Sequence, residues 1–329
     1  MKIKNFLFSL ISLLFILLSF GLSSWGAEYP SRNIQMVEPF GPGGSTDLGS
    51  KIISNYMEKY LRQPLVPLYK PGGGTTIAAK YLMASKPDGY TVMVGNPENV
   101  TFYPRIVKGA DYGTDAITPL FGYGQVIMAI CVKEDSPWKT LNDFITDAKK
   151  NPNHFRHGSY GAITFSHFLM ALINHHSGTQ TRHVPFASPG EMTTALLGGH
   201  VDLIAATGAI GGLLKANKIR VLAISSAERT DLLPGIPTLK ELGYPVVITF
   251  YHGFWAPNGT PQEIQNILIQ SGYKSLKEHH GEIKKQYFDI EMIPAWADQE
   301  AYKRVMLERK QLHDYIIDLL KIPTYDDKK

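Results

Sequence analysis

One local pattern constrains the fold of this chain most: a short apolar run, a glycine-rich turn and a helical pattern follow one another directly. The first example runs from the apolar residues at Ile34 through the turn at 39–47 into a helical pattern at 48–61. Glycines allow the backbone to approach a ligand closely because they have no Cβ. The unpaired N–H groups at a helix start favour anions. The turn therefore predicts a small anion held by backbone amides, without identifying that anion.

Similar loops that follow strands and open helices recur at three later places, 71–76, 158–164 and 187–190. In open α/β sheets, ligands bind beyond the carboxyl ends of the strands, where such loops collect. Two early loops that face two later loops would form a cleft between domains. The pattern therefore predicts an α/β protein with a binding cleft, and the length of 329 residues suffices for two domains.

The alternation of apolar runs and helical periodicity defines the elements that we expect. Predicted strands lie at 34–39, 65–69, 90–95, 125–132, 181–185, 201–206, 219–225 and 246–254. Predicted helices lie at 46–61, 75–84, 141–150, 164–176, 189–197, 261–278 and 298–320.

The first residues predict export from the cytoplasm. Lys2 and Lys4 precede an apolar run at 6–20, and small residues follow this run up to Ala27. Basic, apolar and small-residue regions in this order are typical of a secretory signal peptide. The apolar run is shorter than the roughly 20 residues of a membrane-spanning helix. We therefore expect residues 1–27 to be a cleavable signal peptide and the protein to be periplasmic, with an uncleaved membrane anchor as the alternative.

Charge and cysteine content exclude some classes of protein. The chain has 33 Lys and Arg against 29 Asp and Glu, and loss of Lys2 and Lys4 would leave 31 basic residues. So small an excess argues against a nucleic-acid-binding surface, which needs a concentrated basic stripe. Cys131 is the only cysteine, so it forms no intrachain disulfide and is expected to pack as a small apolar side chain.

The sequence lacks the motifs of nucleotide-binding and acyl-transfer enzymes. Neither Gly44 nor Gly74 is followed by lysine, so the glycine loops are not nucleotide-binding P-loops. Ser166 and His167 are adjacent on a predicted helix and cannot face each other, and no G-x-S-x-G elbow is present. We therefore expect no enzymatic activity, with an exported hydrolase as the weakest alternative.

The eleven histidines raise the possibility of a metal site. His154 and His157 are three residues apart, and doublets occur at His175–His176 and at His279–His280. No H-E-x-x-H pattern and no cysteine cluster accompanies them. We therefore expect solvated or capping histidines, with no metal and no cofactor.

At these motifs the chain resembles the Bug family, the TctC-like periplasmic solute receptors of tripartite tricarboxylate transporters. The resemblance covers nearly the whole mature sequence, and its pieces are specific because they occur together and in family order. They are the segments 29–34 (YPSRNI), 39–47 (PFGPGGSTD), 71–74 (PGGG), 86–91 (KPDGYT), 184–186 (VPF), 196–202 (LLGGHVD) and 256–261 (APNGTP).

The resemblance implies a two-domain periplasmic binding protein of type II, a Venus flytrap that closes around a ligand in the cleft between its domains. We expect domain 1 to comprise residues 28–124 and 248–329, and domain 2 to comprise residues 125–247. The chain would cross between the domains near 122–126 and return near 247–251.

The resemblance also implies a set of ligand-binding residues. Family members hold carboxylates mainly through backbone amides, hydroxyls and ordered waters, and the four loops of this chain contain no arginine. Carried over by position, the first domain would offer Phe40, Gly43, Gly44, Ser45, Asp47, Thr75, Thr76 and Asn96. The second would offer Ser159, Thr164, His167, Ala187 and Ser188, and the aromatic segment 250–255 adds Tyr251 as a wall or hinge residue.

The function implied is that of a monomeric receptor that captures a di- or tricarboxylate by domain closure and delivers it to large and small integral-membrane permease subunits. A ligand-sensing adaptor for a membrane sensor kinase and a receptor for an amino acid or other non-carboxylate solute are the alternatives. Three departures from the family pattern bear on the ligand class: Ile163, Ala187 and Glu98. Glu98 in particular would bring a negative charge near the cleft mouth.

Overall fold

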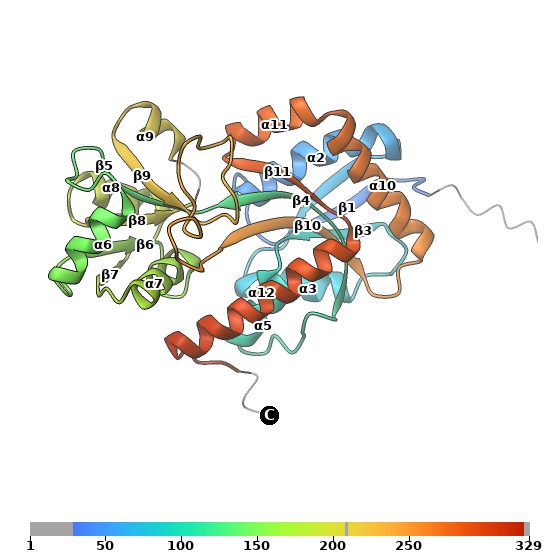
Figure 1. The fold of residues 1–329 in the computed structure, drawn as a ribbon. Helices are drawn as coiled ribbons and strands as arrows, with labels where there is room; N and C mark the ends of the chain where they lie inside the picture. The colour runs from blue at the N-terminus through green and yellow to red at the C-terminus, as the bar shows by residue number, and fades with distance from the viewer. Residues whose placement is uncertain (1–28, 208–209, 326–329) are drawn as a thin grey trace, which may run out of the picture.

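Two β-sheets, each flanked by helices, lie side by side and are connected at the middle of the molecule (Figure 1). The computed structural model describes residues 29–207 and 210–325, so the predicted signal peptide at residues 1–27 lies outside the described residues. The predicted α/β class with two halves is confirmed. Within the described ranges, no helix combines the length and apolar character that a membrane span requires.

The first half is built on a six-stranded mixed sheet with the order β11-β4-β10-β3-β1-β2. β1 is parallel to β2 and to β3, whereas β10 is antiparallel to both of its neighbours. The strands are β1 (Ile34–Glu38), β2 (Leu65–Tyr69), β3 (Thr91–Gly95), β4 (Ile117–Ile127), β10 (Thr249–Pro257) and β11 (Met292–Ala297). The helices are α2 (Ser45–Leu61), α3 (Thr76–Met83), α4 (Glu98–Thr101), α5 (Tyr103–Ile106), α10 (Gln262–Glu278), α11 (His280–Asp289) and α12 (Gln299–Leu320), and a 3₁₀ turn, η1 (Gly73–Thr75), precedes α3.

The second half is built on a five-stranded sheet with the order β7-β6-β8-β5-β9. β6 is parallel to β7 and to β8, and β5 is antiparallel to β8 and to β9. The strands are β5 (Ala129–Lys133), β6 (Arg156–Ser159), β7 (Arg182–Pro185), β8 (Leu203–Ala206) and β9 (Ile219–Ile224). The helices are α6 (Leu141–Lys150), α7 (Phe165–Ser177), α8 (Pro189–Leu197) and α9 (Gly211–Lys215).

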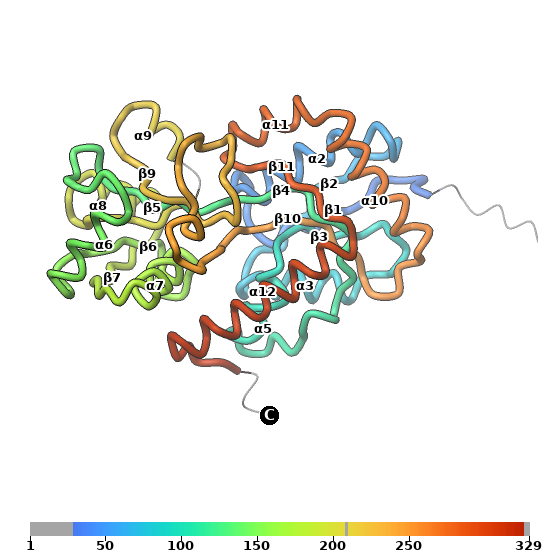
Figure 2. The backbone as a smooth tube through the Cα atoms, viewed as in Figure 1, coloured from blue at the N-terminus to red at the C-terminus, as the bar shows by residue number. Residues whose placement is uncertain are grey.

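The backbone passes from one sheet to the other at two points that lie side by side (Figure 2). β4 leads into β5 through Met128, and the return path runs through Ile248 into β10. The buried Ser225 ties the two crossings together. Its hydroxyl accepts a 2.9 Å hydrogen bond from the Met128 N–H and donates a 2.5 Å hydrogen bond to the Ile248 carbonyl. The backbone of Ser225 also bonds to both residues, at 2.9 Å and 3.0 Å.

Glycines allow the central strands to pack closely. Gly122 on β4 pairs with Gly253 on β10. A Cβ at Gly122 would lie 2.4 Å from the ring of Tyr251, and a Cβ at Gly253 would lie 2.4 Å from the ring of Tyr302 on α12. Neither position has room for a side chain, so these glycines are required by packing.

Some elements differ from those predicted, for identifiable reasons. The single strand predicted at 125–132 is wrong, because the chain changes sheets at Met128 and forms the end of β4 and most of β5. β6 was not predicted since its sequence RHGS is polar, and β11 was not predicted since it contains Pro294. Proline is tolerated on β11 because it is an edge strand, where a backbone donor can be spared.

Phe102, between α4 and α5, joins the two halves of the molecule. Its side chain is fully buried, and its ring centroid lies 5.3 Å from that of Phe165 and 5.5 Å from that of Phe168, both on α7. Its ring also lies 5.4 Å from that of His313 on α12. Elements of both halves therefore share one hydrophobic core around this ring.

We expect Phe102→Ala to destabilise the protein by about 3–5 kcal/mol, because it leaves a cavity in that shared core. The free energy of unfolding from urea titration measures the effect. Ile77→Ala is the matched control, since Ile77 is 49% exposed and its loss should change stability by less than about 0.5 kcal/mol. Equal effects of the two substitutions would contradict the role given to Phe102.

The last residue of β1, Glu38, carries a buried carboxyl group. Its Oε1 accepts a 2.5 Å hydrogen bond from the Ser50 hydroxyl, while Oε2 has no hydrogen-bond partner among the described residues. Burial raises the pKa of Glu38 from 4.5 to about 7, and the bond from Ser50 only partly offsets that rise. Asp47 adds to the rise, and Lys51 opposes it.

Glu38 should make the protein less stable as the pH rises. Because its folded pKa of about 7 exceeds the unfolded value of 4.5, the stabilisation is complete below pH 4.5 and is lost as the pH passes through 7. Between pH 5 and pH 8 this loss should lower the free energy of unfolding by about 2.5 kcal/mol in the wild type, and it should be absent in Glu38→Gln. The exposed Glu58→Gln on α2 should keep the wild-type pH dependence. If Glu38→Gln kept the wild-type pH dependence, ionisation of the Glu38 carboxyl group would cost no stability, and the prediction would be wrong.

Candidate functional site

The first predicted loop, between β1 and α2, is held in shape by Asp47. Its Oδ2 accepts a 2.8 Å hydrogen bond from the Gly43 N–H, and its Oδ1 accepts from the Tyr69 hydroxyl at 2.7 Å and from Lys51 Nζ at 2.8 Å. Asp47 is buried, and its charge is compensated by these donors. Gly44 at the start of α2 supplies no side-chain cap, so the amides of the first turn remain for another acceptor.

The second loop carries a strained residue. The three glycines at 72–74 have positive φ angles, and so does the following Thr75, at 72°. A left-handed conformation at a β-branched residue costs about 1–3 kcal/mol and is characteristic of functional sites. Thr75 is buried, and its hydroxyl accepts a 2.9 Å hydrogen bond from Asn99 Nδ2. The hydroxyl of Thr76 closes the loop by donating to the Gly73 carbonyl at 2.7 Å.

Asn99 connects this loop to the end of β3. Its Oδ1 accepts a 2.8 Å hydrogen bond from the Asn96 N–H, while its Nδ2 bonds to Thr75. The side-chain oxygen of Asn96 is buried and has no partner among the described residues. A buried acceptor without a protein partner usually bonds to water or to a ligand. Thr75, Asn96 and Asn99 therefore form one polar constellation, of which Asn99 was not predicted.

The third loop follows β6 and opens α7. The Ser159 hydroxyl donates to the Gly161 carbonyl at 2.8 Å and lies 2.6 Å from His183 Nε2. Thr164 also donates to the Gly161 carbonyl at 2.8 Å, and its oxygen caps α7 by accepting from the His167 N–H. These two hydroxyls therefore hold the loop in shape.

The fourth loop, between β7 and α8, is organised as a helix cap. The Ser188 hydroxyl accepts a 3.3 Å hydrogen bond from the Glu191 N–H, and Glu191 Oε2 accepts from the Ala187 N–H at 3.1 Å. Ser188 thus satisfies a donor of the first turn of α8. Ile163 in the third loop, one of the three departures from the family pattern, is 50% exposed.

The structure also places three further residues that the sequence singled out. Phe40 is half-buried just after β1, and Tyr251 is 7% exposed within a core cluster that also contains Trp255 and Tyr302. The position expected for Glu98 is wrong: the residue is buried at 1% exposure rather than placed at a cleft mouth, and its Oε1 lies 3.5 Å from His313 Nε2. Packing of α12 against α4 covers this carboxylate, which sequence spacing does not reveal.

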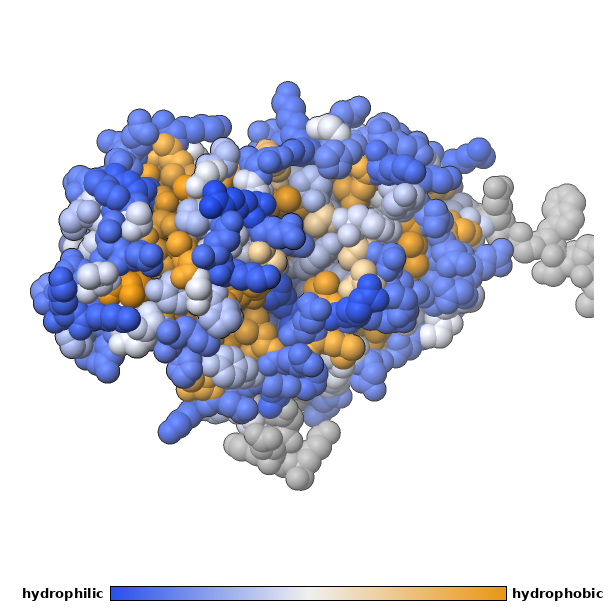
Figure 3. Space-filling model, viewed as in Figure 1, coloured by the Kyte–Doolittle hydropathy of each residue, from blue (hydrophilic) through white to orange (hydrophobic). Residues whose placement is uncertain are grey.

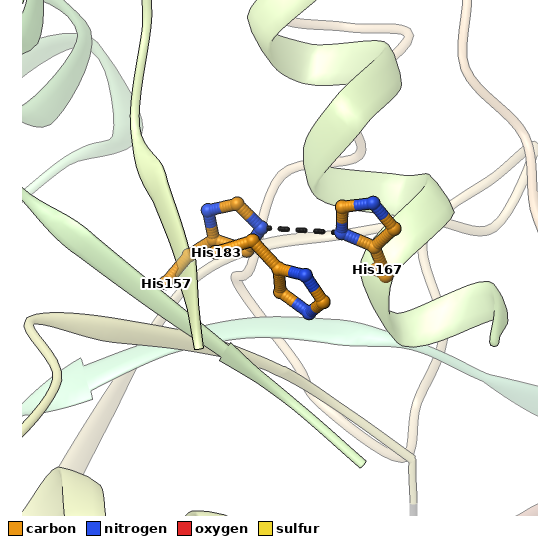
Figure 4. Close-up of side chains that lie close together, drawn as sticks. All are labelled: His157, His167 and His183. Atoms are coloured by element: carbon orange, nitrogen blue, oxygen red, sulfur yellow. Dashed lines mark hydrogen bonds between the residues drawn. The ribbon is translucent and has the colours of Figure 1, made fainter. Parts of the chain in front are cut away.

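Three histidines from separate elements meet in the second half of the molecule (Figure 4). One potential ligand atom of each of His157 on β6, His167 on α7 and His183 on β7 lies within 4.8 Å of the others. Burial lowers the pKa of His157 to about 3 and of His167 to about 4, and repulsion from the neighbouring ring of His183 adds to both shifts. The expectation of solvated or capping histidines is wrong for His157, which is only 2% exposed.

Two cavities lie between the halves, near the crossing strands. One of about 450 Å³ is bordered by Gln125, the loop 226–231 and α11. A second of about 350 Å³ is lined mainly by apolar residues of β4, β5, α9, the loop at 232–233 and α11. Figure 3 shows hydrophobic residues gathered on the surface over α9 and β9. No predicted site residue lines either cavity.

Sequence comparison places the chain among receptor proteins. The profile of the family described as the tripartite tricarboxylate transporter family receptor, TctC, matches residues 50–322. A Cupriavidus necator relative, the UPF0065 protein in the gbd 5' region, is 32% identical over 299 residues, which cover 89% of each chain. The protein BugT of Bordetella pertussis is 28% identical over 247 residues, which cover 73% of this chain and 75% of BugT.

Solved structures agree with the sequence comparison. A TctC solute-binding protein from Polaromonas, solved without ligand, superposes with a TM-score of 0.78 at 28% identity over 88% of this chain and 99% of that chain. A protein from R. palustris solved with adipate has a TM-score of 0.74 at 25% identity over 90% of this chain and 99% of that chain. The predicted resemblance is thus confirmed, and this chain belongs to the TctC family of tripartite tricarboxylate transporter receptors.

Proposed function

We propose that this protein is a non-catalytic periplasmic receptor that binds a small dicarboxylate between its two halves. Family membership supports the receptor role, and the adipate in the R. palustris relative supports the ligand class. The observation that carries the proposal is the strained Thr75, joined through Asn99 to the unpartnered oxygen of Asn96. A protein retains such strain where a fixed backbone geometry serves binding.

Electrostatics at the loops favours an anion, although the four loops contain no arginine. The amides at the uncapped start of α2 supply hydrogen-bond donors and the positive end of a helix dipole. Asp47 sits in that first turn, but its charge is matched by Lys51 and by two further donors. The carboxylate of Glu98 is buried beside His313 rather than exposed. A ligand carboxylate at these loops would therefore meet N–H groups rather than a free negative charge.

We further propose that the halves act as the two domains predicted at 28–124 with 248–329, and at 125–247. The ligand-binding set would be the one expected from the family pattern, with Asn99 added as a positioning residue. The protein would act as a monomer and deliver its ligand to the large and small permease subunits. Closure over the ligand would be favoured because the closed state adds contacts from the second domain.

Adipate should bind the mature protein with a one-to-one stoichiometry in isothermal titration calorimetry. Other di- and tricarboxylates, titrated as a panel, should bind with affinities above or below that of adipate. Adipamide is the matched control, because it has the same chain length without charge. It should bind weakly or not at all, since the N–H groups are arranged for anions. Equal affinities for adipate and adipamide would contradict recognition of the ligand by its charge. If no carboxylate in the panel bound, the proposed ligand class would be wrong.

Asn99→Ala should weaken ligand binding by about tenfold or more, because it unties the strained Thr75 loop from the end of β3. The dissociation constant is measured well below the unfolding temperature, since the loss of a fully buried amide also lowers stability. Asn266→Ala is the control, because Asn266 is exposed on α10 and accepts a hydrogen bond from Gln262 on the same helix. Retention of wild-type affinity in Asn99→Ala would exclude the constellation from ligand binding.

A further inference from the structure

We propose that His157, His167 and His183 form a binding site for a divalent transition-metal ion of the Zn²⁺ type. The three side chains come from three different elements, and the fold alone brings them together, as Figure 4 shows. The site does not depend on the proposed carboxylate-binding function, although His167 also belongs to the predicted ligand-binding set.

The candidate ligand atoms lie close enough for a tetrahedral metal once the stacked rings turn so that one nitrogen of each points to a common centre. With Zn–N bonds of about 2.0–2.1 Å, two ligand nitrogens of a tetrahedral site lie about 3.3–3.4 Å apart. His157 Nε2 and His167 Nδ1 are already 3.5 Å apart, and the candidate ligand atoms of the three residues lie within 4.8 Å of one another. A separation of 3.5 Å is long for a hydrogen bond, so no strong bond between these rings has to be broken.

Hydroxyl groups orient two of the rings in the way that metal-binding histidines require. When the Ser159 hydroxyl donates its proton to the Gly161 carbonyl at 2.8 Å, His183 Nε2 at 2.6 Å is the donor of the hydrogen bond to Ser159 Oγ. This leaves the lone pair of His183 on Nδ1. His157 Nδ1 lies 2.8 Å from the Thr181 hydroxyl, which is itself anchored by Asn174. A second partner that holds one ring nitrogen fixes the tautomer and frees the other nitrogen for the metal.

The ligand type and the exposure of the three histidines suit a transition metal. A neutral imidazole is the form that binds a metal. Imidazole nitrogen suits Zn²⁺, Cu²⁺ and Ni²⁺ rather than Mg²⁺ or Ca²⁺. His167 and His183 are half-buried, so an ion can enter from solvent, and three protein ligands leave a fourth position for water.

The alternative is a purely structural stack of neutral rings. His167 and His183 lie with their ring centroids 3.8 Å apart, which is close stacking. Stacking alone, however, requires neither the convergence of nitrogen atoms nor the hydroxyl partners at His157 and His183. A metal site accounts for both features.

The test uses untagged mature protein, stripped of metal with EDTA and then dialysed. Zn²⁺ titration by calorimetry gives stoichiometry and affinity, and the visible absorption of Co²⁺-loaded protein reports nitrogen ligands in a tetrahedral site. His183→Ala removes a ligand on the edge strand β7, and Thr181→Val removes the partner of His157. His176→Ala is the matched control, because His176 lies exposed on the same helix as His167.

We expect one Zn²⁺ per chain, a loss of affinity of more than about tenfold in His183→Ala, and a loss of about 10–100-fold in Thr181→Val. His176→Ala should bind as the wild type does. His167→Gln is the second variant, should circular dichroism show that His183→Ala is unfolded. Absence of a saturable one-to-one Zn²⁺ site, or equal affinity of the ligand variants and the control, overturns the proposal. Adipate titration in the presence of EDTA reads out the carboxylate function separately.

Discussion

The close antiparallel pairing of β4 with β10 is the constraint on which the rest of the structure depends. These two strands are neighbours in the six-stranded sheet, where β4 lies next to the edge strand β11, and their ends lead into and out of the other half. Their approach to each other and to α12 is so close that Gly122 and Gly253 have no room for a Cβ. Because β4 and β10 are fixed in this way, β3 on β10 and β1 on β3 present their following loops at a defined place. The candidate site is therefore positioned by strands that contribute few of its side chains.

An element of the fold could be predicted where its signal lies in neighbouring residues of the sequence. The β1–α2 and β2 segments were predictable because apolar runs, glycine turns and helical periodicity lie next to one another in the sequence. β6 was not, since its RHGS sequence carries no apolar signal, and the change of sheets at Met128 was not, since the apolar run continues through it. Nor could sequence spacing indicate that Glu98 is covered by α12.

The same distinction applies to the candidate site. The loops that open helices were visible as glycine and hydroxyl motifs, and family order assigned residues to them. Asn99 was missed because its role arises from two hydrogen bonds to residues on different loops. His157 and His183 were missed because they are 26 residues apart and meet only through the parallel pairing of β6 with β7, which places them in register. A positive φ at Thr75 is likewise a property of the folded loop, for which the preceding glycines give only an indirect signal.

Ser225 has a mechanical consequence for the molecule. Its hydroxyl and backbone bond to Met128 on one crossing and to Ile248 on the other, so both covalent connections converge on a single buried residue. A rotation of one half against the other must either keep these three residues together or break hydrogen bonds in a buried environment, which costs about 1–3 kcal/mol for each group left unsatisfied. The least costly path therefore has its pivot at Ser225. The rotation axis then passes through the junction, and displacement grows with distance from this one serine.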